Sequence, residues 1–437
     1  MLTFQPSKKM TGVESSKSMF RHHTHCRACG LGKPQIPTLK VVTGDLLKPK
    51  EEKLVEVMDL GIMPLANDFA DASEEHAGYA PLKLMWCPRC SLGQLSVVVN
   101  PKDLYTTYSY VTSHSATMQE HFSRLTGDLL VHECKPGSVV EIGSNDGSFL
   151  EHCLREGFDS VIGVEPAGNL CDLALKKGIN TRNEFFNERV ARELANDCVV
   201  PDLIVARHVF CHIDDWQETI HALGILCAKH TVIAIEVPYF LDTVKKGEWD
   251  QIYHEHLSYM TVKAMEYALK DSMLHIHATQ HYPIHGGAIV ILLRRNDCEI
   301  APTNREPEEI TKAQLIGFSD KSESLVLELR DTVIKFVQQG KTVVGYGASA
   351  KATQWIQLCG FTRKHISFVC DETIQKQYKL MPGTDIPVVH PSALTRELPD
   401  YAVMFCWNFA DEVINKEKIF SDKGGKWIIP LPELKVV

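Results

Sequence analysis

The sequence predicts an α/β protein built from a small zinc-binding N-terminal lobe and two Rossmann-like, doubly wound domains. Two cysteine pairs of the CxxC type lie within the first ninety residues, and two later stretches alternate short apolar runs with segments of helical length. The cysteine pairs are typical of a zinc site, and the alternation is typical of βαβ units around a parallel sheet. A chain of 437 residues also exceeds what one hydrophobic core usually serves, so several domains are expected.

The overall composition disfavours several classes of protein. Hydrophobic residues make up 44% and charged residues 23% of the chain, which is an ordinary globular balance. A net charge of −9 disfavours nucleic acid as a partner. The longest apolar runs, such as residues 231–237, are far shorter than the roughly 18 to 20 residues that a membrane helix needs. The first twenty residues lack the apolar core of a signal peptide, so we expect a cytoplasmic protein without a membrane partner, monomeric or weakly homo-oligomeric.

The first block, about residues 20–120, is expected to be a zinc-binding domain. Its two pairs, Cys26 with Cys29 and Cys87 with Cys90, are separated by 57 residues. A two-residue spacer turns both thiolates of a pair toward one tetrahedral ion, and four thiolates complete a closed structural Zn²⁺ site. Four buried free cysteines are the alternative, whereas a redox role is disfavoured because neither pair follows a strand-to-helix turn.

The second block, about residues 121–295, is expected to be a doubly wound domain that binds a nucleoside-like ligand. Its apolar runs, each followed by a segment of helical length, are SVVEIGS, SVIGVEP, PDLIVARH and TVIAIEV. Such runs predict the strands of a parallel sheet, whose carboxyl edge is where ligands bind.

A glycine loop follows the first of these strands. Glu141, Gly143, Asn145 and Gly147 lie in VVEIGSNDGSF, and Glu165 ends the next strand 18 residues after Gly147. The glycines allow close approach of a ligand to the backbone, and the later acid suits two ribose hydroxyls. The spacing resembles the first motif of class I S-adenosylmethionine methyltransferases, with an asparagine, which tolerates positive φ, at a position where glycine is usual. We therefore expect S-adenosylmethionine as the cofactor and these five residues as its site.

Two histidine-rich segments follow at the same predicted edge. His212 lies in VFCHIDDW, directly after the PDLIV strand, and Tyr253, Glu255 and His256 lie in DQIYHEH. A phenol, a carboxylate and imidazoles at close spacing suit proton transfer, because histidine titrates near neutrality and a carboxylate orients it. From the residues alone, a polar patch or a second metal site remains the alternative.

The motifs taken together resemble those of the nucleotide-sugar C-methyltransferases of deoxysugar pathways. In order, and over most of the chain, these are CxxC…CxxC, EIGSNDG, VFCHIDDW, DQIYHEH, HGG, GYGASAK and PGTDIPV. The resemblance implies zinc in the N-terminal lobe, S-adenosylmethionine in the middle domain and a second Rossmann-like domain at the carboxyl end. It also implies methylation at C-3 of a 4-keto-6-deoxy sugar attached to a nucleotide, usually thymidine diphosphate.

The resemblance further implies roles for individual residues. His256 would be the base that forms an enolate, with Glu255 and Tyr253 beside it and His212 near the 4-keto oxygen. Position 254 is histidine, where members from antibiotic pathways carry aspartate, and this departure from the family pattern bears on the choice of sugar more than on the reaction.

The sequence does not decide which of two tyrosines lines the pocket, or whether one loop histidine does. Tyr108 and Tyr110, in YSYVTSHS, match a family stretch that contributes a tyrosine to the pocket, and spacing does not choose between them. His285, in HGG, is either at the rim of the substrate pocket or in an ordinary turn. Asn67 is expected to cap or turn the zinc lobe. Lys376 and Lys379 could meet the diphosphate, but exposed lysines usually solvate a loop, so a solvated loop lysine is the expectation.

The third block, about residues 308–437, is expected to be a second doubly wound domain after an amphipathic helix over 308–340. Its runs are KTVVGYGA, HISFVCDE, DIPVVHP, YAVMFCW and KWIIPLP. Gly345 and Gly347 have the G-x-G-x-x-A spacing of a nicotinamide fingerprint, so a NAD(P)-dependent oxidoreductase is the alternative function. The resemblance instead implies a domain without a cofactor, in which the two glycines and Lys351 bind the diphosphate of the substrate. A scaffold with an inactive core is disfavoured, because one chain retains Glu141, Gly143, Glu165, Glu255 and His256.

Overall fold

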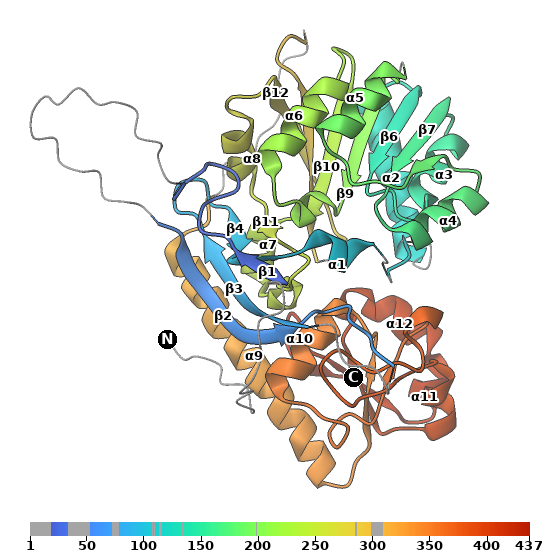
Figure 1. Cartoon of the computed structure of the whole chain (residues 1–437). Coiled ribbons are helices and arrows are strands. Elements are labelled where there is room, and N and C mark those ends of the chain that lie inside the picture. The colour runs from blue at the N-terminus through green and yellow to red at the C-terminus, as the bar shows by residue number, and fades with distance from the viewer. Residues whose placement is uncertain are drawn as a thin grey trace, which may run out of the picture.

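The computed structural model describes residues 19–33, 53–71, 78–106, 108, 110–112, 116–132, 134–197, 199–284, 286–298 and 309–437. Within these ranges the chain forms three parts, with the N-terminal strands lying between the middle and C-terminal parts (Figure 1). No helix in the described ranges is long and apolar enough to cross a membrane.

The N-terminal part contains a two-stranded sheet, β1–β5, and a four-stranded antiparallel sheet with the order β11-β4-β3-β2. Its elements are β1 (Phe20–His22), β2 (Val55–Pro64), β3 (Tyr79–Trp86), β4 (Gly93–Leu95), β5 (Val97–Val99) and α1 (Pro101–Tyr105). Buried and less buried side chains alternate along β3, because successive residues of a strand point to opposite faces. The fourth strand, β11 (Ser258–Tyr259), comes from the middle of the chain and pairs with β4. The segment just before β11, which includes DQIYHEH, is therefore attached to the N-terminal part.

The middle part is a seven-stranded sheet with the order β12-β13-β10-β9-β6-β7-β8. The strands are β6 (Ser138–Ile142), β7 (Ser160–Val164), β8 (Thr181–Arg182), β9 (Leu203–Arg207), β10 (Val232–Pro238), β12 (Leu274–Tyr282) and β13 (Ala288–Arg295). The helices are α2 (Ala116–His132), α3 (Ser148–Arg155), α4 (Gly168–Lys176), α5 (Glu188–Asn196), η2 (Phe210–His212), α6 (Trp216–Leu226), α7 (Phe240–Lys246), η3 (Trp249–Gln251) and α8 (Val262–Leu269). The four predicted strands are confirmed as β6, β7, β9 and β10, which pair in parallel.

The C-terminal part is a six-stranded sheet with the order β16-β15-β14-β17-β18-β19, parallel except for its last pair. Its strands are β14 (Val343–Tyr346), β15 (Val369–Cys370), β16 (Val388–Val389), β17 (Tyr401–Met404), β18 (Lys426–Ile429) and β19 (Lys435–Val436). Its helices are α9 (Lys312–Gln338), α10 (Ala350–Cys359), η4 (Ile374–Lys376), α11 (Ser392–Glu397), η5 (Trp407–Phe409), α12 (Ala410–Lys416) and α13 (Lys418–Asp422). The predicted amphipathic helix is confirmed as α9, which starts with a capping box at Thr311 and contacts β2 and α7.

The fold class predicted from the sequence is confirmed, and its topology indicates where a ligand would bind. The strand order reverses between β6 and β9 in the middle sheet and between β14 and β17 in the C-terminal sheet. Open α/β sheets bind ligands in the crevice at such points, beyond the carboxyl ends of the strands. One hydrophobic cluster includes residues of all three parts, for example Leu84, Ile235 and Trp355, so the parts share a common core.

Candidate active site

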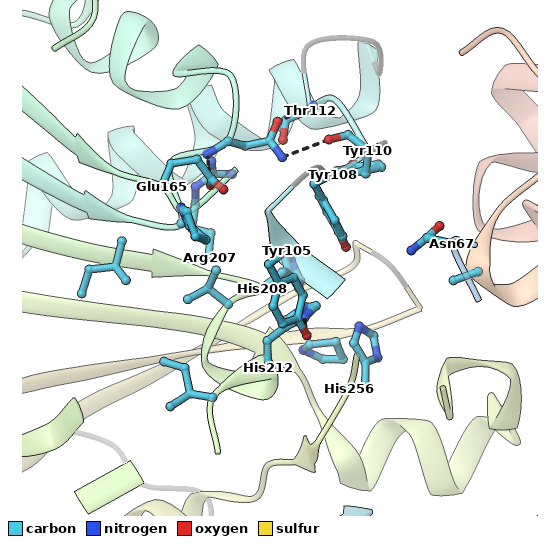
Figure 2. Close-up of a pocket in the computed structure, with 18 of the residues that line it drawn as sticks. Asn67, Tyr105, Tyr108, Tyr110, Thr112, Glu165, Arg207, His208, His212 and His256 are labelled. Carbon is cyan, nitrogen blue, oxygen red and sulfur yellow. Dashed lines mark hydrogen bonds between the residues drawn. The ribbon is translucent and has the colours of Figure 1, made fainter. Parts of the chain in front are cut away.

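A cavity of about 440 Å³ lies where the three parts meet (Figure 2). It opens beyond both topological switch points, because loops after β6, β9, β14 and β17 all reach it. Among the residues that line it are Tyr105, Tyr108, Tyr110, Gly143, Asn145, Glu165, Arg207, His212, Tyr253, His256, Lys351 and Lys376. Most residues predicted to be catalytic and several predicted to bind the cofactor thus face one space.

The glycine loop after β6 takes the left-handed backbone that its sequence suggested. Gly143, Asn145 and Gly147 have φ values of 65°, 51° and 73°. A Cβ atom on Gly143 would lie 2.0 Å from a methyl group of Val209, so no side chain fits there. Gly147 caps the start of α3, packs against Ile179 and does not line the cavity. Its place is therefore in the turn of the loop.

Glu165 closes the loop from the end of β7. Its two carboxylate oxygens each accept a backbone N–H at 2.9 Å, one from Asn145 and one from Ala167. Burial raises the pKa of Glu165. The Asn145 side chain accepts the N–H of Thr112 and donates to the carbonyl of Tyr110, both at 3.1 Å. The glycine loop, the Glu165 carboxylate and the segment 110–112 therefore form one hydrogen-bonded unit that suits an adenosyl group.

Glu141, which was predicted to bind the cofactor, does not line the cavity and contacts Arg207 instead. The carboxylate is fully buried and accepts hydrogen bonds of 3.0 and 2.7 Å from this guanidinium. Burial raises the pKa of Glu141 to about 7, against the opposing effect of the arginine. The guanidinium lies over the rings of Phe122 and Phe149, at 4.4 and 4.3 Å, and lines the cavity. Arg207, which the sequence patterns did not single out, therefore links Glu141 to the ligand space.

His256 lies in the turn between η3 and β11. Its Nδ1 is 2.9 Å from the Gln251 carbonyl, and its Nε2 is 2.6 Å from the Tyr253 hydroxyl. A carbonyl only accepts, so Nδ1 carries the ring proton and Nε2 accepts the phenol hydrogen bond in the neutral imidazole. The basic atom of His256 therefore faces Tyr253 and the cavity.

His212 lies at the end of η2, next to His256. Their ring centroids are 5.2 Å apart, at an interplanar angle of 88°. The Tyr105 hydroxyl lies 2.9 Å from His212 Nδ1 and 3.1 Å from the backbone carbonyl of Glu255. Burial lowers the pKa of His212 to about 4, so its imidazole is neutral at pH 7. Cys211 offers a thiol whose sulfur lies within 4.8 Å of both histidine ligand atoms, which gives the second-metal-site alternative a geometric basis.

The tautomer of His212 depends on where the single Tyr105 proton points. If Tyr105 donates to Nδ1, the ring proton of His212 is on Nε2, and His212 becomes a hydrogen-bond donor. If Tyr105 donates to the Glu255 carbonyl, Nδ1 carries the ring proton and Nε2 can only accept. Tyr105, which the sequence reasoning missed, therefore controls the chemistry of this imidazole.

The Glu255 carboxylate is fixed by two residues of the N-terminal part. Asn67 donates to one oxygen at 2.6 Å, and the Tyr108 hydroxyl donates to the other at 2.9 Å. Burial raises the pKa of Glu255. Tyr110 also lines the cavity, but its side chain is 40% exposed and its carbonyl bonds to Asn145. Tyr108 is therefore the tyrosine nearer the predicted catalytic groups, and Asn67 is more than a turn residue.

His254 points out of the site. Its Nε2 lies 3.1 Å from the carbonyl of Ala80 in β3, and it does not line the cavity. Burial lowers its pKa to about 4, so it is uncharged at pH 7. The histidine at this position therefore alters packing against the N-terminal sheet and adds no charge to the cavity.

The C-terminal part contributes two lysines to the cavity. Lys351, in the first turn of α10, lies 3.8 Å from the buried Asp250 and over the ring of Trp407 at 4.3 Å. Lys376 is only 6% exposed and donates to the carbonyl of Ala348 at 2.9 Å. The expectation of a solvated loop lysine at 376 was wrong, because η4 turns this side chain inward.

The glycines of GYGASA do not line the cavity. A Cβ atom on Gly345 would lie 2.7 Å from the Phe405 ring, and one on Gly347, whose φ is 87°, would lie 2.7 Å from the sulfur of Cys406. These glycines make room for Phe405 and Cys406, the two residues after β17, and the segment that follows Gly347 brings Ser349, Ala350 and Lys351 to the cavity. His285 falls outside the described residues.

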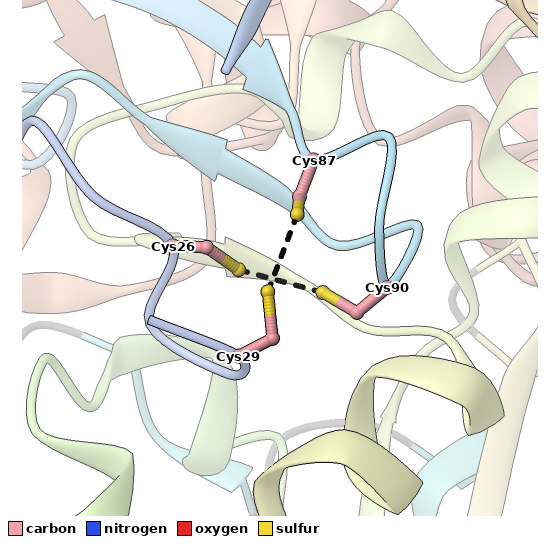
Figure 3. A group of neighbouring side chains, drawn as sticks. All are labelled: Cys26, Cys29, Cys87 and Cys90. Atoms are coloured by element: carbon pink, nitrogen blue, oxygen red, sulfur yellow. Dashed lines mark hydrogen bonds between the residues drawn. The ribbon is translucent and has the colours of Figure 1, made fainter. Parts of the chain in front are cut away.

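The four predicted zinc ligands converge on one point (Figure 3). The sulfur of Cys26 lies 3.4 Å from that of Cys90, and the sulfur of Cys29 lies 3.5 Å from that of Cys87. A tetrahedral ion with Zn–S bonds of about 2.3 Å requires sulfur separations of about 3.8 Å. The four thiols therefore fit a closed zinc site, which leaves no coordination position for a substrate.

The two cysteine pairs form matching turns. In each, the N–H of the first cysteine, Cys26 or Cys87, donates to the carbonyl five positions later, at 2.7 and 2.9 Å. The residue after the second cysteine, Gly30 or Ser91, is left-handed, with φ of 66° and 63°. Both spacers thus turn the chain as the sequence predicted.

Comparisons with known proteins agree with this geometry. Residues 283–432 match the family described as “C-methyltransferase C-terminal domain”, residues 115–277 the “Methyltransferase domain” and residues 50–105 the “Putative zinc binding domain”. The chain is 32% identical to C-methyltransferase NovU of Streptomyces niveus over 414 residues, which cover 90% of this chain and 98% of that relative.

Two solved structures are similar to part of the chain. The PH0226 protein from Pyrococcus horikoshii OT3 is 9% identical, with a TM-score of 0.34, and the similarity covers 45% of this chain and 98% of that one. The plantazolicin methyltransferase BpumL in complex with SAH is 13% identical, with a TM-score of 0.32, over 41% of this chain and 87% of that one.

The oxidoreductase alternative gains no support. The family model over residues 283–432 includes the GYGASA segment, and its description is that of a C-methyltransferase domain. The glycines that suggested a nicotinamide site are packed against Phe405 and Cys406, which directly follow β17.

Proposed function

The chain belongs to the family of zinc-binding, S-adenosylmethionine-dependent C-methyltransferases, and on this premise we propose that it methylates C-3 of a nucleotide-linked 4-keto-6-deoxy sugar. One observation carries the proposal: Glu165 and Asn145 face the same cavity as the imidazoles of His212 and His256 (Figure 2). A methyl donor and a basic group can therefore act on one substrate from two sides.

We propose domains over residues 20–120, 121–295 and 308–437. The zinc-binding, methyltransferase and C-terminal family models support this division, since they match 50–105, 115–277 and 283–432. β11 belongs to the middle domain by sequence but pairs with β4 of the first, so the division of the chain and the division of the sheets differ there.

The proposed reaction begins with removal of a proton from the carbon next to the ketone. His256 takes the C-3 proton on Nε2, the ring nitrogen that lacks a proton in the free protein. Tyr253 keeps Nε2 hydrogen-bonded until the sugar arrives. The Gln251 carbonyl, which accepts the Nδ1 proton of His256, stabilises the imidazolium that forms. Bound S-adenosylmethionine supplies the electrophilic methyl group.

The negative charge that develops on the 4-keto oxygen needs a donor. His212 supplies it from Nε2 when the Tyr105 hydroxyl donates to Nδ1, at the 2.9 Å separation observed. Because His212 is neutral, the donor is an imidazole and not an imidazolium. Glu255, held by Asn67 and Tyr108, orients the turn that carries the base.

The nucleotide end of the substrate is assigned to the C-terminal part. Lys351 and Lys376 bring positive charge to the cavity near the start of α10, where backbone N–H groups also favour an anion. A diphosphate suits this combination, and we assign it there, with a nucleotide such as thymidine attached.

The substrate assay uses the full chain with S-adenosylmethionine and a thymidine diphosphate 4-keto-6-deoxy sugar. We expect mass spectrometry to show a product heavier by one methylene, and NMR to show the new methyl carbon bonded to C-3. The matched control is the same sugar nucleotide reduced to the 4-hydroxyl, which has no acidic C-3 proton and should give no product. Methylation on oxygen, or methylation of the reduced sugar, would overturn the proposed chemistry.

The two tyrosines left open by the sequence give a matched pair of variants. We expect Tyr108→Phe to lower kcat by about tenfold or more, because one oxygen of the buried Glu255 loses its donor. Tyr110→Phe removes the hydroxyl of a residue that is 40% exposed, and we expect a change in kcat within about twofold. Steady-state kinetics of both variants check this, and equal losses would contradict it.

A further inference from the structure

We propose that Arg27, in the spacer of the first cysteine pair, is a positioning residue that holds the loops of His212 and His256 in register. The inference rests on the proposed roles of these two histidines. Arg27 lies between the zinc ligands Cys26 and Cys29. The inference therefore links the structural zinc site to the positions of the two histidines.

The guanidinium of Arg27 contacts both catalytic loops at once. Its Nε donates to a carboxylate oxygen of Asp214 at 3.0 Å. Its Nη1 donates to the carbonyl of Leu257 at 3.1 Å and to that of Leu95, in β4, at 3.3 Å. The side chain has 0% exposed surface, so water does not compete for these contacts.

The acceptors of Arg27 lie next to the two histidines in the sequence. Asp214 lies two residues after His212, and Leu257 directly follows His256. An arginine side chain offers its donors in a rigid planar fork, so one group fixes two acceptors relative to each other. Arg27 thereby fixes the spacing of the two loops, whose histidine rings lie 5.2 Å apart.

Arg27 is itself held by the zinc turn. Its backbone N–H donates to the side-chain oxygen of Gln94 at 3.0 Å, and its neighbours on both sides are zinc ligands or adjoin one. A zinc ion bound by four thiolates leaves net negative charge, and a buried guanidinium close by offsets it. The connection from the zinc turn through Arg27 to both loops is short; it is buried at Arg27 and at the Leu257 carbonyl, and only the Asp214 side chain is partly exposed, at 18%.

Arg21 provides the matched control. It also forms an ion pair with Asp214, but its side chain is 57% exposed and none of its described contacts reaches Leu257. Replacing Arg21 therefore removes an arginine from the same carboxylate without touching the His256 loop.

The test compares Arg27→Gln, Arg27→Lys and Arg21→Gln in the full-length, zinc-containing protein. We expect Arg27→Gln to lower kcat by about 10²-fold, because small misplacement of catalytic groups has effects of this size. Zinc content should stay equal to that of the unsubstituted protein, and the Kd for S-adenosylhomocysteine should change by no more than about twofold. Arg27→Lys should recover part of the turnover, since a lysine reaches only one of the acceptors, and Arg21→Gln should stay within about twofold.

Failure of this inference and failure of the proposed function give different results. Normal turnover in Arg27→Gln beside an inactive His256→Asn would overturn the inference alone. Normal turnover in His256→Asn would overturn the proposed base. If Arg27→Gln loses zinc or does not fold, Asp214→Asn decides: it lies outside the zinc turn, and wild-type kcat in that variant would overturn the inference, whereas a loss of about tenfold with zinc retained would support it.

Discussion

Replacing His256 with asparagine is expected to lower turnover by about 10³-fold or more while leaving S-adenosylhomocysteine binding unchanged. Asparagine fills a similar space and keeps a donor for the Gln251 carbonyl, but it has no basic nitrogen at the place of Nε2. The loop around Glu165 is held by other contacts, so the affinity of the protein for S-adenosylhomocysteine should not change with the loss of turnover. Steady-state kinetics measures turnover, and calorimetric titration measures S-adenosylhomocysteine binding, on the same protein.

A separate readout isolates the proton-transfer step. In D₂O without the methyl donor, the unsubstituted protein should exchange the C-3 hydrogen of the 4-keto sugar, and His256→Asn should not. His221→Asn is the control, because His221 is exposed and its described ion pair is with Glu188, on the surface. Exchange at the normal rate in His256→Asn would assign the base to another residue.

Replacing Cys26 with serine is expected to remove the zinc and to destabilise the protein strongly. Structural four-thiolate sites contribute about 10 kcal/mol or more of binding free energy to folding, and a missing ligand forfeits much of it. We expect the first thermal transition to fall by about 10 °C. Elemental analysis and melting followed by circular dichroism check the two effects.

Cys227 offers the same substitution away from the cluster. It is buried, and its thiol donates to the carbonyl of Ala228, which a serine hydroxyl can also do. Cys227→Ser should therefore keep its zinc. A full zinc equivalent in Cys26→Ser would count against the four-sulfur site.

Much of the fold was predictable because parallel strands carry their information locally. β6, β7, β9 and β10 appear in the sequence as short apolar runs, since both faces of a parallel sheet are buried. The loop after β6 was visible for a similar reason: its glycines and Asn145 are required by positive φ. The CxxC pairs likewise carry their geometry in a two-residue spacer.

The parts that were not predictable depend on contacts between distant segments. Asn67 reaches Glu255, and Tyr105 reaches His212, across long stretches of chain that leave no periodic pattern. Lys376 is buried only because η4 folds beside the start of α10. Glu141 was predicted to bind the cofactor from its place before the glycine loop, but in the packed structure it pairs with Arg207 and does not line the cavity.

The pairing of β11 with β4 has a consequence for the order in which the chain can fold. β4 gains its second neighbour only when Ser258 and Tyr259 arrive, so the first sheet keeps an open edge until more than half of the chain has left the ribosome. The cysteine turns can bind their ion earlier, because Cys90 precedes that strand by a long interval. A chimera that exchanges the first hundred residues between relatives would therefore have to bring the matching β11 with it, or leave an unpaired strand beside the turn that carries His256.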